Sequence, residues 1–179
     1  MNLSLIGYRG TGKSTIAKIL ALRTARPVVN LDAAIVQAAG MSIPEIVERH
    51  GWDYFRDLES QVLEQALRHD RQILDCGGGI ILRPQNRRKL KQAGPVVWLT
   101  APVPVIVARI KDDTQRPSLT GKSFIEEVEE VLAEREPLYR QCADHVIPTD
   151  SLSPEEAADK ILELTGWPKA NKLFSRRKG

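Results

Sequence analysis

Short apolar runs alternate along the chain with longer segments of helical periodicity. Five runs stand out as expected strands, and their almost continuous apolar character suits strands buried on both faces of a sheet. These runs are residues 2–6, 27–30, 72–76, 95–100 and 145–148. Strands that alternate with helices are typical of a parallel sheet with crossover helices. The pattern therefore predicts an α/β fold.

Polar residues and glycines mark several helix boundaries. In the pattern S-x-x-E, a serine and a glutamate satisfy each other's free backbone donors in the first turn of a helix. Gly94 and Gly166 stand where C-caps are expected, after helices predicted at 87–93 and 157–165. Three helix starts carry the S-x-x-E pattern: Ser42 with Glu45, Ser123 with Glu126, and Ser153 with Glu156.

Two segments interrupt the alternation of strand and helix. Residues 33–71 have helical patterning but are too long for one crossover helix, and we expect this insertion to bind a substrate. Residues 111–122 are polar, with Pro117, Gly121 and few apolar anchors. Because a segment with few apolar contacts opens easily, we expect 111–122 to form a mobile lid.

Length and composition predict one domain that folds without disulfides or a structural metal. The chain has 179 residues, and a domain of this size buries roughly 70% of the surface of its unfolded chain. Cys76 and Cys142 are too few for a disulfide framework and match no zinc pattern. The N-terminal residues lack the basic start of a secretory signal, and the longest apolar region, 96–108, is too short to span a bilayer. We therefore expect a cytoplasmic protein without a membrane partner.

The positive charge is concentrated at the C-terminal end of the chain. The net charge is +3, but residues 166–179 carry five basic and no acidic residues, so the remaining 165 residues sum to −2. Only 5% of the residues are aromatic, which leaves few surfaces for stacking on bases. We therefore expect no nucleic-acid partner, and we interpret 1–165 as the domain and 166–179 as a basic, disordered tail.

A phosphate-binding loop follows the first expected strand. Residues 7–14, GYRGTGKS, fit the pattern G-x-x-x-x-G-K-[ST] between a strand and a helix, as the motif requires. In such a loop backbone N–H groups converge on phosphate oxygens, the lysine reaches the β- and γ-phosphates, and the serine coordinates Mg²⁺. The alternative is a glycine-rich turn that matches by chance. We expect nucleotide binding by Gly10, Thr11, Gly12, Lys13, Ser14 and Thr15, with Mg²⁺ as the cofactor held by Ser14.

A carboxylate at the end of the third expected strand is a second candidate for the metal site. Residues 73–78, ILDCGG, follow the pattern apolar, apolar, Asp, x, x, Gly. A strand that ends in a carboxylate beside the phosphate loop can hold the water shell of the metal. We therefore expect Asp75 to bind Mg²⁺ in its outer shell; alternatively, Asp75 merely caps the glycine turn.

Four further features could hold the molecule that accepts a phosphate. They are Asp32 after the second strand, Arg56 in the insertion, the glycines Gly77, Gly78 and Gly79 after the third strand, and Arg135 after the lid and its helix. Each alone has a structural explanation. Asp32 could cap a helix that begins at residue 33, and the glycines could form a tight turn. Arg56 could pair with Glu59 on a solvated helix face, and Arg135 stands between two glutamates that could neutralise it. Their occurrence together after a phosphate loop favours a binding site.

Taken together, these motifs resemble the shikimate kinase family, a branch of the P-loop proteins related in fold to nucleoside monophosphate kinases. The resemblance covers about residues 3–165. It rests on GYRGTGKS at 7–14, Asp32 after the second strand, FRDLE at 55–59, the three glycines 77–79, Arg116-Pro117 in the lid, and REPLY at 135–139. The resemblance implies a three-layer fold whose five-stranded parallel sheet has the order 2-3-1-4-5. It also implies transfer of the γ-phosphate of ATP to the 3-hydroxyl of shikimate.

The same resemblance implies roles for individual residues. Asp32 would contact the acceptor hydroxyls, and Arg56, Arg135 and the backbone of Gly78 would hold shikimate, with both arginines on its carboxylate. A planar guanidinium can meet a carboxylate through two parallel hydrogen bonds. Glu59 would orient Arg56. The resemblance further implies that Arg116 of the lid reaches the phosphates as a catalytic residue with Lys13 and Asp32, and that Arg109 packs on the adenine.

Position 30 departs from the family pattern. Where many members have Asp-x-Asp, this chain has Asn30-Leu31-Asp32, and many members lack an acid at the position of Asp75. We hypothesise that Asp75 takes over the electrostatic role that is missing at Asn30. The alternative is that neither residue matters, because Ser14 and the phosphates dominate the coordination of the metal.

Two other functions remain open from the sequence. One is a different small-molecule kinase on the same scaffold, such as a gluconate or nucleoside monophosphate kinase, whose acceptors also carry anionic groups. The other is a weakly catalytic ATP-binding switch whose lid reports ATP to a partner protein. We expect ATP and shikimate as the small-molecule partners of a monomer.

Overall fold

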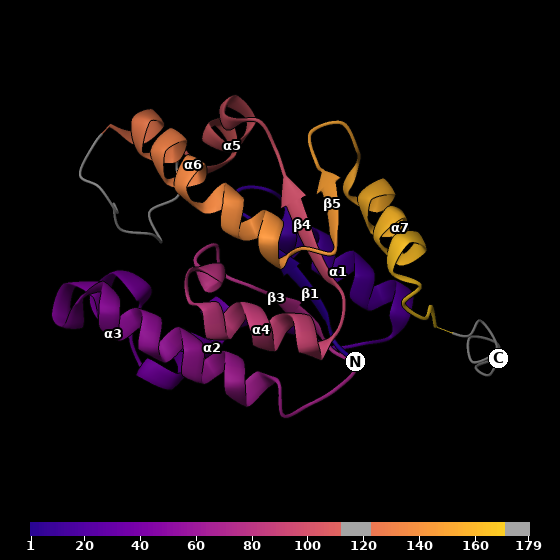
Figure 1. Ribbon diagram of the computed structural model, residues 1–179, viewed down its shortest axis with the longest axis horizontal. Helices are drawn as coiled ribbons and strands as arrows, with labels where there is room; N and C mark the ends of the chain where they lie inside the picture. Colours follow the sequence, from indigo (N-terminus) through magenta and orange to yellow (C-terminus); the bar gives the residue numbers. More distant parts are fainter. Residues whose placement is uncertain (112–122, 171–179) are drawn as a thin grey trace, which may run out of the picture.

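A single five-stranded sheet forms the centre of the molecule (Figure 1). The computed structural model describes residues 1–111 and 123–170. The strands are β1 (Leu3–Ile6), β2 (Val28–Asn30), β3 (Ile73–Asp75), β4 (Val96–Thr100) and β5 (His145–Pro148). They are parallel throughout and have the order β2-β3-β1-β4-β5. The predicted α/β class, strand order and location of all five strands are therefore confirmed.

The helices connect the strands and cover both faces of the sheet. They are α1 (Lys13–Thr24), α2 (Leu31–Ala39), α3 (Ile43–Ala66), α4 (Pro84–Ala93), α5 (Val103–Ile110), α6 (Phe124–Cys142) and α7 (Pro154–Thr165), with a short 3₁₀ helix η1 (Ile80–Leu82). The expected insertion 33–71 contains most of α2 and all of α3, and the backbone of α3 departs from helical geometry at Gly51. Within the described residues, no helix combines the length and apolar character needed to cross a membrane.

Two apolar layers follow from the alternation of side chains along each strand. Leu3 and Leu5 of β1 lie on the face that packs against α1 and α7. Ile6 of β1, Leu74 of β3 and Trp98 of β4 belong to the cluster that includes residues of α2, α3, α4 and α6. Figure 1 shows α1 and α7 on one side of the strands and α3, α4 and α6 on the other. The helices thus cover the two faces of the sheet, whereas the expected site residues Asp32 and Asp75 lie at the carboxyl ends of β2 and β3.

The three expected helix starts are realised to different degrees. Ser153 and Glu156 form the complete capping box at α7. At α3, Ser42 accepts from the backbone N–H of Glu45 but donates its hydroxyl hydrogen to that residue's carboxylate. Ser123 precedes α6 and makes no capping hydrogen bond among the described residues. The S-x-x-E pattern thus located each helix, although only one copy forms both reciprocal bonds.

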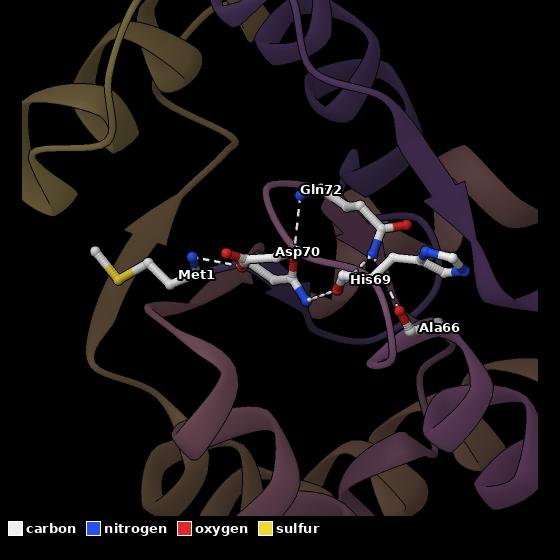
Figure 2. A network of polar contacts seen from close by, with 6 residues as sticks. Met1, Ala66, His69, Asp70 and Gln72 are labelled. Atoms are coloured by element: carbon white, nitrogen blue, oxygen red, sulfur yellow. Dashed lines mark hydrogen bonds and ion pairs between the residues drawn. The ribbon is translucent and has the colours of Figure 1, made fainter.

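A hydrogen-bond network ties the turn between α3 and β3 to the start of the chain (Figure 2). Asn2 accepts from the N–H of Gln72 at 3.0 Å and donates to the carbonyl oxygen of His69 at 3.1 Å. The side-chain amide of Gln72 donates to the carbonyl oxygens of Ala66 and His69, both at 3.0 Å. These bonds fix where β3 begins beside β1. They therefore also fix the position of the carboxyl end of β3, where Asp75 lies and is followed by the glycine run, residues 77–79.

Residues 166–170 differ from the expected disordered tail. Gly166 ends α7, and the side chain of Trp167 is only 4% exposed within the cluster formed by α1, α7 and one face of the sheet. The N–H of Ala170 donates to the carbonyl oxygen of Arg23 at 2.9 Å. The tail prediction is therefore wrong for this stretch, because an apolar anchor stands among basic residues. Residues 171–179, and the expected lid apart from Lys111 at its start, lie outside the described residues.

Candidate active site

The phosphate-binding loop connects β1 to α1. Its last glycine, Gly12, is the N-cap of α1 and has φ 94°. Lys13 is only 8% exposed, and its ammonium group donates to the carbonyl oxygens of Gly7 at 2.8 Å and Tyr8 at 2.9 Å. Thr11 donates to the Tyr8 carbonyl oxygen at 2.8 Å. The loop thus holds a cation at the N-terminus of a helix, an arrangement that favours bound phosphate.

A cavity of about 470 Å³ opens beside this loop at the carboxyl ends of β2 and β3. The loop contributes Lys13 and Ser14, the β2 end contributes Asn30 and Asp32, and the β3 end contributes Asp75. Gly77 and Gly78 also line the cavity. Parallel α/β sheets place ligands at this edge, outside the carboxyl ends of the strands. Two of the expected site residues, Asp32 and Asp75, therefore line the same cavity as the phosphate loop.

Asp75 is the most buried carboxylate of this cavity and accepts hydrogen bonds from two other elements. Its Oδ2 accepts from the Ser14 hydroxyl at 2.6 Å and from the Asn30 amide at 3.2 Å. Only 5% of the residue is exposed. Burial raises the pKa of the Asp75 carboxyl above its usual value, while the Ser14 hydrogen bond and the charge of Lys13 act in the opposite direction. The contact with Ser14 brings both expected metal-site residues together.

Asn30, not Asp32, caps α2. The Asn30 side chain accepts a hydrogen bond from the N–H of Ala33 at 2.9 Å, and the backbone of Asn30 is extended. Asp32 lies in the first turn of the helix and lines the cavity. The alternative explanation of Asp32 as an N-cap is therefore wrong. Its negative charge stands in the first turn, where the helix dipole favours it, at the wall of the cavity.

Arg56 and Glu59 form an ion pair that is withdrawn from solvent. The Arg56 guanidinium donates to Glu59 Oε1 at 2.8 Å, and the Glu59 side chain is only 1% exposed. The guanidinium carbon lies 5.5 Å from the Trp52 ring centroid and 5.0 Å from that of Phe55. A methyl group at Gly79 would overlap the guanidinium. Arg56 is therefore held against the glycine run. The expected pairing of Arg56 with Glu59 is present, but the expectation that it lies on a solvated helix face is wrong.

Arg135 approaches the same glycine run from α6. A methyl group added at Gly78 would stand 3.3 Å from the guanidinium of Arg135 and 3.6 Å from the Tyr139 hydroxyl. That hydroxyl donates to the Gly78 carbonyl oxygen at 2.6 Å. Glu136, one of the two glutamates beside Arg135, lies 3.6 Å from Arg140 instead. Two guanidinium groups from distant parts of the chain thus meet at adjacent glycines.

Burial dominates the ionisation of Tyr139. It raises the pKa of the Tyr139 phenol to about 12, although the hydrogen bond and positive charge of Arg135 favour the ionised form. The phenol ring also stacks on Trp98, with ring centroids 5.6 Å apart. Tyr139 therefore stays neutral and acts as a hydrogen-bond donor to the glycine run across the physiological pH range.

Arg109 lies on the opposite side of the phosphate loop from the acceptor residues. Its guanidinium donates to the carbonyl oxygen of Gly10 at 3.0 Å and to the hydroxyl and carbonyl oxygens of Thr149, each at 3.3 Å. Thr149 in turn donates to the carbonyl oxygen of Thr11 at 2.7 Å. A second cavity of about 240 Å³ is lined by Arg109, Thr149 and Pro154, among others, and reaches the loop at Gly12. Arg109 and the phosphate loop thus share a cavity of their own.

Comparison with known proteins identifies the family. The family model described as "Shikimate kinase" matches residues 9–165. A "Shikimate kinase 2" from Photorhabdus laumondii is 44% identical over 165 residues, which cover 90% of this chain and 94% of the relative. A shikimate kinase from Nitratidesulfovibrio vulgaris is 43% identical over 82% of this chain and 86% of its own. The chain belongs to the shikimate kinase family. It is therefore an enzyme that transfers a phosphate group.

A solved structure from the family has the same fold. The shikimate kinase of Acinetobacter baumannii, in complex with shikimate, superposes with a TM-score of 0.87 at 36% identity, over 91% of each chain. The resemblance of the sequence to the shikimate kinase family, and the three-layer fold that it implied, are thus confirmed.

Two residues, Tyr139 and Thr149, contact the expected site residues but were not predicted to have a role there. Tyr139 was part of a recognised motif, and its spacing of four residues from Arg135 is the signal that both lie on one face of a helix. Thr149 directly follows β5, at the edge of the sheet where ligands bind. Arg116, the expected catalytic residue of the lid, lies outside the described residues.

Proposed function

We propose that this member of the shikimate kinase family transfers the γ-phosphate of ATP to the 3-hydroxyl of shikimate at the carboxyl edge of the sheet. The observation that carries the proposal is the meeting of Arg56 and Arg135 at Gly78 and Gly79, beside the cavity of the phosphate loop. The relative from Acinetobacter baumannii, which binds shikimate, supports the choice of acceptor.

Arg56 and Arg135 suit a carboxylate better than a hydroxyl-rich neutral sugar. Each guanidinium is planar and carries five N–H donors in a fixed fork, which matches the two oxygens of a carboxylate. Glu59 accepts from one edge of Arg56 and restricts its orientation. The aromatic rings of Trp52 and Phe55 lie close to the same guanidinium. A rigid pair of cations can therefore orient the acceptor with little loss of side-chain entropy.

Asp32 would orient the acceptor hydroxyl towards the phosphate. Phosphoryl transfer through a loose transition state leaves the proton on the acceptor until late, so positioning matters more than basicity. Lys13 would stabilise the negative charge on the transferred group, and the bonds from its ammonium group to two loop carbonyl oxygens hold it at the loop. We propose that Arg116 adds positive charge when the lid closes, which also excludes water from the reaction.

Mg²⁺ fits the residues at the loop. The described residues contain no cluster of three metal-binding side chains, but Mg²⁺ bound with a nucleotide takes most ligands from phosphates and water, and only one or two from protein oxygens. The Ser14 hydroxyl and the Asp75 carboxylate are hard oxygen donors 2.6 Å apart at the cavity. Ser14 would bind the ion and Asp75 would hold its water shell; the ion, when bound, neutralises charge on the phosphates.

The nucleotide would lie across the loop, with its base in the cavity beside Arg109. The backbone of Gly10, Thr11 and Gly12, together with Ser14 and Thr15, would bind the phosphates. The cationic face of Arg109 suits stacking on an adenine ring. ATP and the acceptor would then approach the loop from opposite sides, as in-line transfer requires.

A panel of acceptors tests the proposed reaction. Release of ADP is followed with shikimate, gluconate and nucleoside monophosphates, each in the presence of Mg²⁺ and ATP. We expect turnover with shikimate that exceeds turnover with the other acceptors by orders of magnitude. Preferential turnover of gluconate or a nucleoside monophosphate would contradict the proposal, as would ATP binding without any acceptor-dependent release of ADP.

A further inference from the structure

Asn30 and Asp75 lie beside each other at the carboxyl ends of neighbouring strands. The register of the parallel pair β2 and β3 places Asn30 next to Asp75. The Asn30 amide nitrogen donates to Asp75 Oδ2 at 3.2 Å. Both residues line the cavity beside the phosphate loop. An amide and a carboxylate from two strands thus form one polar pair within this cavity.

The amide of Asn30 serves two partners at once. Its oxygen accepts from the N–H of Ala33 at 2.9 Å and so caps α2, whose first turn carries Asp32. Its nitrogen donates to Asp75. A carboxylate at this position could cap the helix, but it could not donate and would place a second negative charge against Asp75. The pair therefore requires one amide and one carboxylate.

Asp75 has capacity for a further partner. A carboxylate offers about four acceptor sites, and Oδ2 of Asp75 accepts from both Ser14, at 2.6 Å, and Asn30. Because these donors come from α1 and β2, they hold the carboxylate from two directions. The remaining acceptor sites can receive a hydrogen bond from water bound to a metal ion.

We propose that Asn30 and Asp75 work as one unit, in which Asp75 supplies a single negative charge to the Mg²⁺–nucleotide complex and Asn30 positions that charge. Asn30 is a positioning residue that also links the metal site to the helix turn of Asp32. This inference rests on the proposed function and deepens it. It implies that the carboxylate and the amide can change places, with the carboxylate at position 30 on β2 and the amide at position 75 on β3, without loss of Mg²⁺ binding.

Binding of Mg²⁺ to the complex of the full chain with ADP, measured by calorimetry without acceptor, tests the proposal. We expect Asp75→Asn to weaken Mg²⁺ binding about 10- to 100-fold, the usual cost of losing an outer-shell partner. The double variant Asn30→Asp/Asp75→Asn restores one carboxylate and one amide, and we expect its affinity for Mg²⁺ to return to within about 3-fold of the original. Asn30→Ala should weaken binding by about 10-fold.

Two control variants separate this role from a structural one. Thr165→Val removes the hydroxyl that accepts from the N–H of Trp167 at the C-terminal end of α7. Thr165 lines neither cavity at the phosphate loop, so this variant should leave Mg²⁺ binding unchanged although it removes a hydrogen bond at a helix end as Asn30→Ala does. Asp53→Asn removes an exposed carboxylate of α3 and should also leave Mg²⁺ binding unchanged. The unfolding temperature without metal shows that each variant is folded.

Three results would overturn the proposal. They are unchanged Mg²⁺ binding in Asp75→Asn, a double variant that binds no better than Asp75→Asn, and an Asn30→Ala variant that binds Mg²⁺ as well as the original chain. Any of them would leave the proposed phosphorylation of shikimate standing, because the acceptor is absent from this measurement. Failure of the acceptor panel, in contrast, would leave the metal measurement valid.

Discussion

At Gly79 the backbone and the guanidinium of Arg56 approach so closely that a methyl group would overlap three guanidinium atoms. Arg56 cannot retreat freely, because Glu59 and the rings of Trp52 and Phe55 surround it. The guanidinium of Arg56, on α3, can occupy this position only because Gly79, just before η1, has no side chain. We therefore expect a substitution at Gly79 to weaken binding of the proposed acceptor through displacement of Arg56.

Gly79→Ala should therefore raise the KM for shikimate about 10- to 100-fold, since a displacement of about 1 Å in a positioning group can cost this much. Gly40→Ala is the matched control. Gly40 has open space around it but φ 67°, so a side chain there is strained and should cost about 1 kcal/mol of stability. Steady-state kinetics and urea unfolding of both variants check the prediction. An unchanged KM in Gly79→Ala would show that Arg56 does not hold the acceptor.

Residue types and spacing predicted the phosphate loop because its chemistry is local. Residues 7–14 contain the whole G-x-x-x-x-G-K-[ST] motif within eight consecutive positions. The role of Asn30 as a cap was not predicted, because asparagine and aspartate are equally good caps and only the three-dimensional structure shows which one accepts from Ala33. The contact between Asn30 and Asp75 depends on strand register, which spacing along the chain does not contain.

The C-terminal half of α6 carries Arg135, the second arginine of the proposed acceptor site. Arg135 and Tyr139 are four residues apart on one face of the helix, and both reach Gly78. Tyr139 is fully buried against Trp98, so its phenol has lost its contact with water. Packing of this helix on the sheet therefore positions Arg135 beside Gly78.

The pKa of Tyr139, about 12, makes stability depend on pH in the alkaline range. The phenol ionises near pH 10 in the unfolded chain and near pH 12 in the folded chain, so its contribution is fully present below pH 10 and is lost as pH rises towards 12. Two pKa units correspond to roughly 2–3 kcal/mol. The free energy of unfolding should therefore fall over this interval, and Tyr139→Phe should remove that part of the decline.

Urea unfolding between pH 8 and 11.5 measures this effect. Tyr139→Phe loses the hydrogen bond to Gly78, so it should be less stable than the original chain at pH 8, and the difference should narrow as pH rises. Cys142, whose pKa burial raises to about 11, adds a decline that both proteins share. Two stability curves that run parallel throughout this range would contradict the account.

Continuous apolar runs located the strands, and helical periodicity located most helices. The helix α2 begins at Leu31 rather than at the expected residue 33, because it follows β2 with no polar break between them. The helix α4 begins at Pro84 rather than at residue 87, since its first turn carries no apolar side chain besides Pro84 to mark it. Helix patterning in 33–71 did not show how α3 brings Arg56 to the glycine run. That approach depends on packing between elements that are distant in the sequence.

The C-terminal part of the described chain packs against its N-terminal part, because the residues after α7 lie against α1. Trp167 packs into the apolar cluster of α1 and α7, and Ala170 donates to the carbonyl oxygen of Arg23. Arg23 also pairs with Asp159 of α7. Composition could not reveal this, because an average over 166–179 is dominated by basic residues and conceals one buried tryptophan.

Trp167→Ala should lower the free energy of unfolding by about 3–5 kcal/mol, the usual cost of removing a buried large aromatic side chain. Leu164→Ala serves as the control, since Leu164 lies in the last turn of α7, just before Trp167, is 43% exposed and should cost far less. Chemical denaturation at neutral pH measures both variants. Equal and small losses would show that the residues after α7 do not contribute to the core.

Arg56 and Arg135, which the fold brings together at Gly78 and Gly79, are the residues that we propose bind the carboxylate of shikimate. The most direct test compares kcat/KM for shikimate and for its methyl ester in the original chain and in Arg56→Lys, with Arg49→Lys as an exposed control on α3. Charged hydrogen bonds contribute about 1.5–3 kcal/mol each. We therefore expect the original chain and the control to prefer the acid by about 100-fold or more, and Arg56→Lys to lose most of this preference. Equal kcat/KM for acid and ester in the original chain would contradict the account.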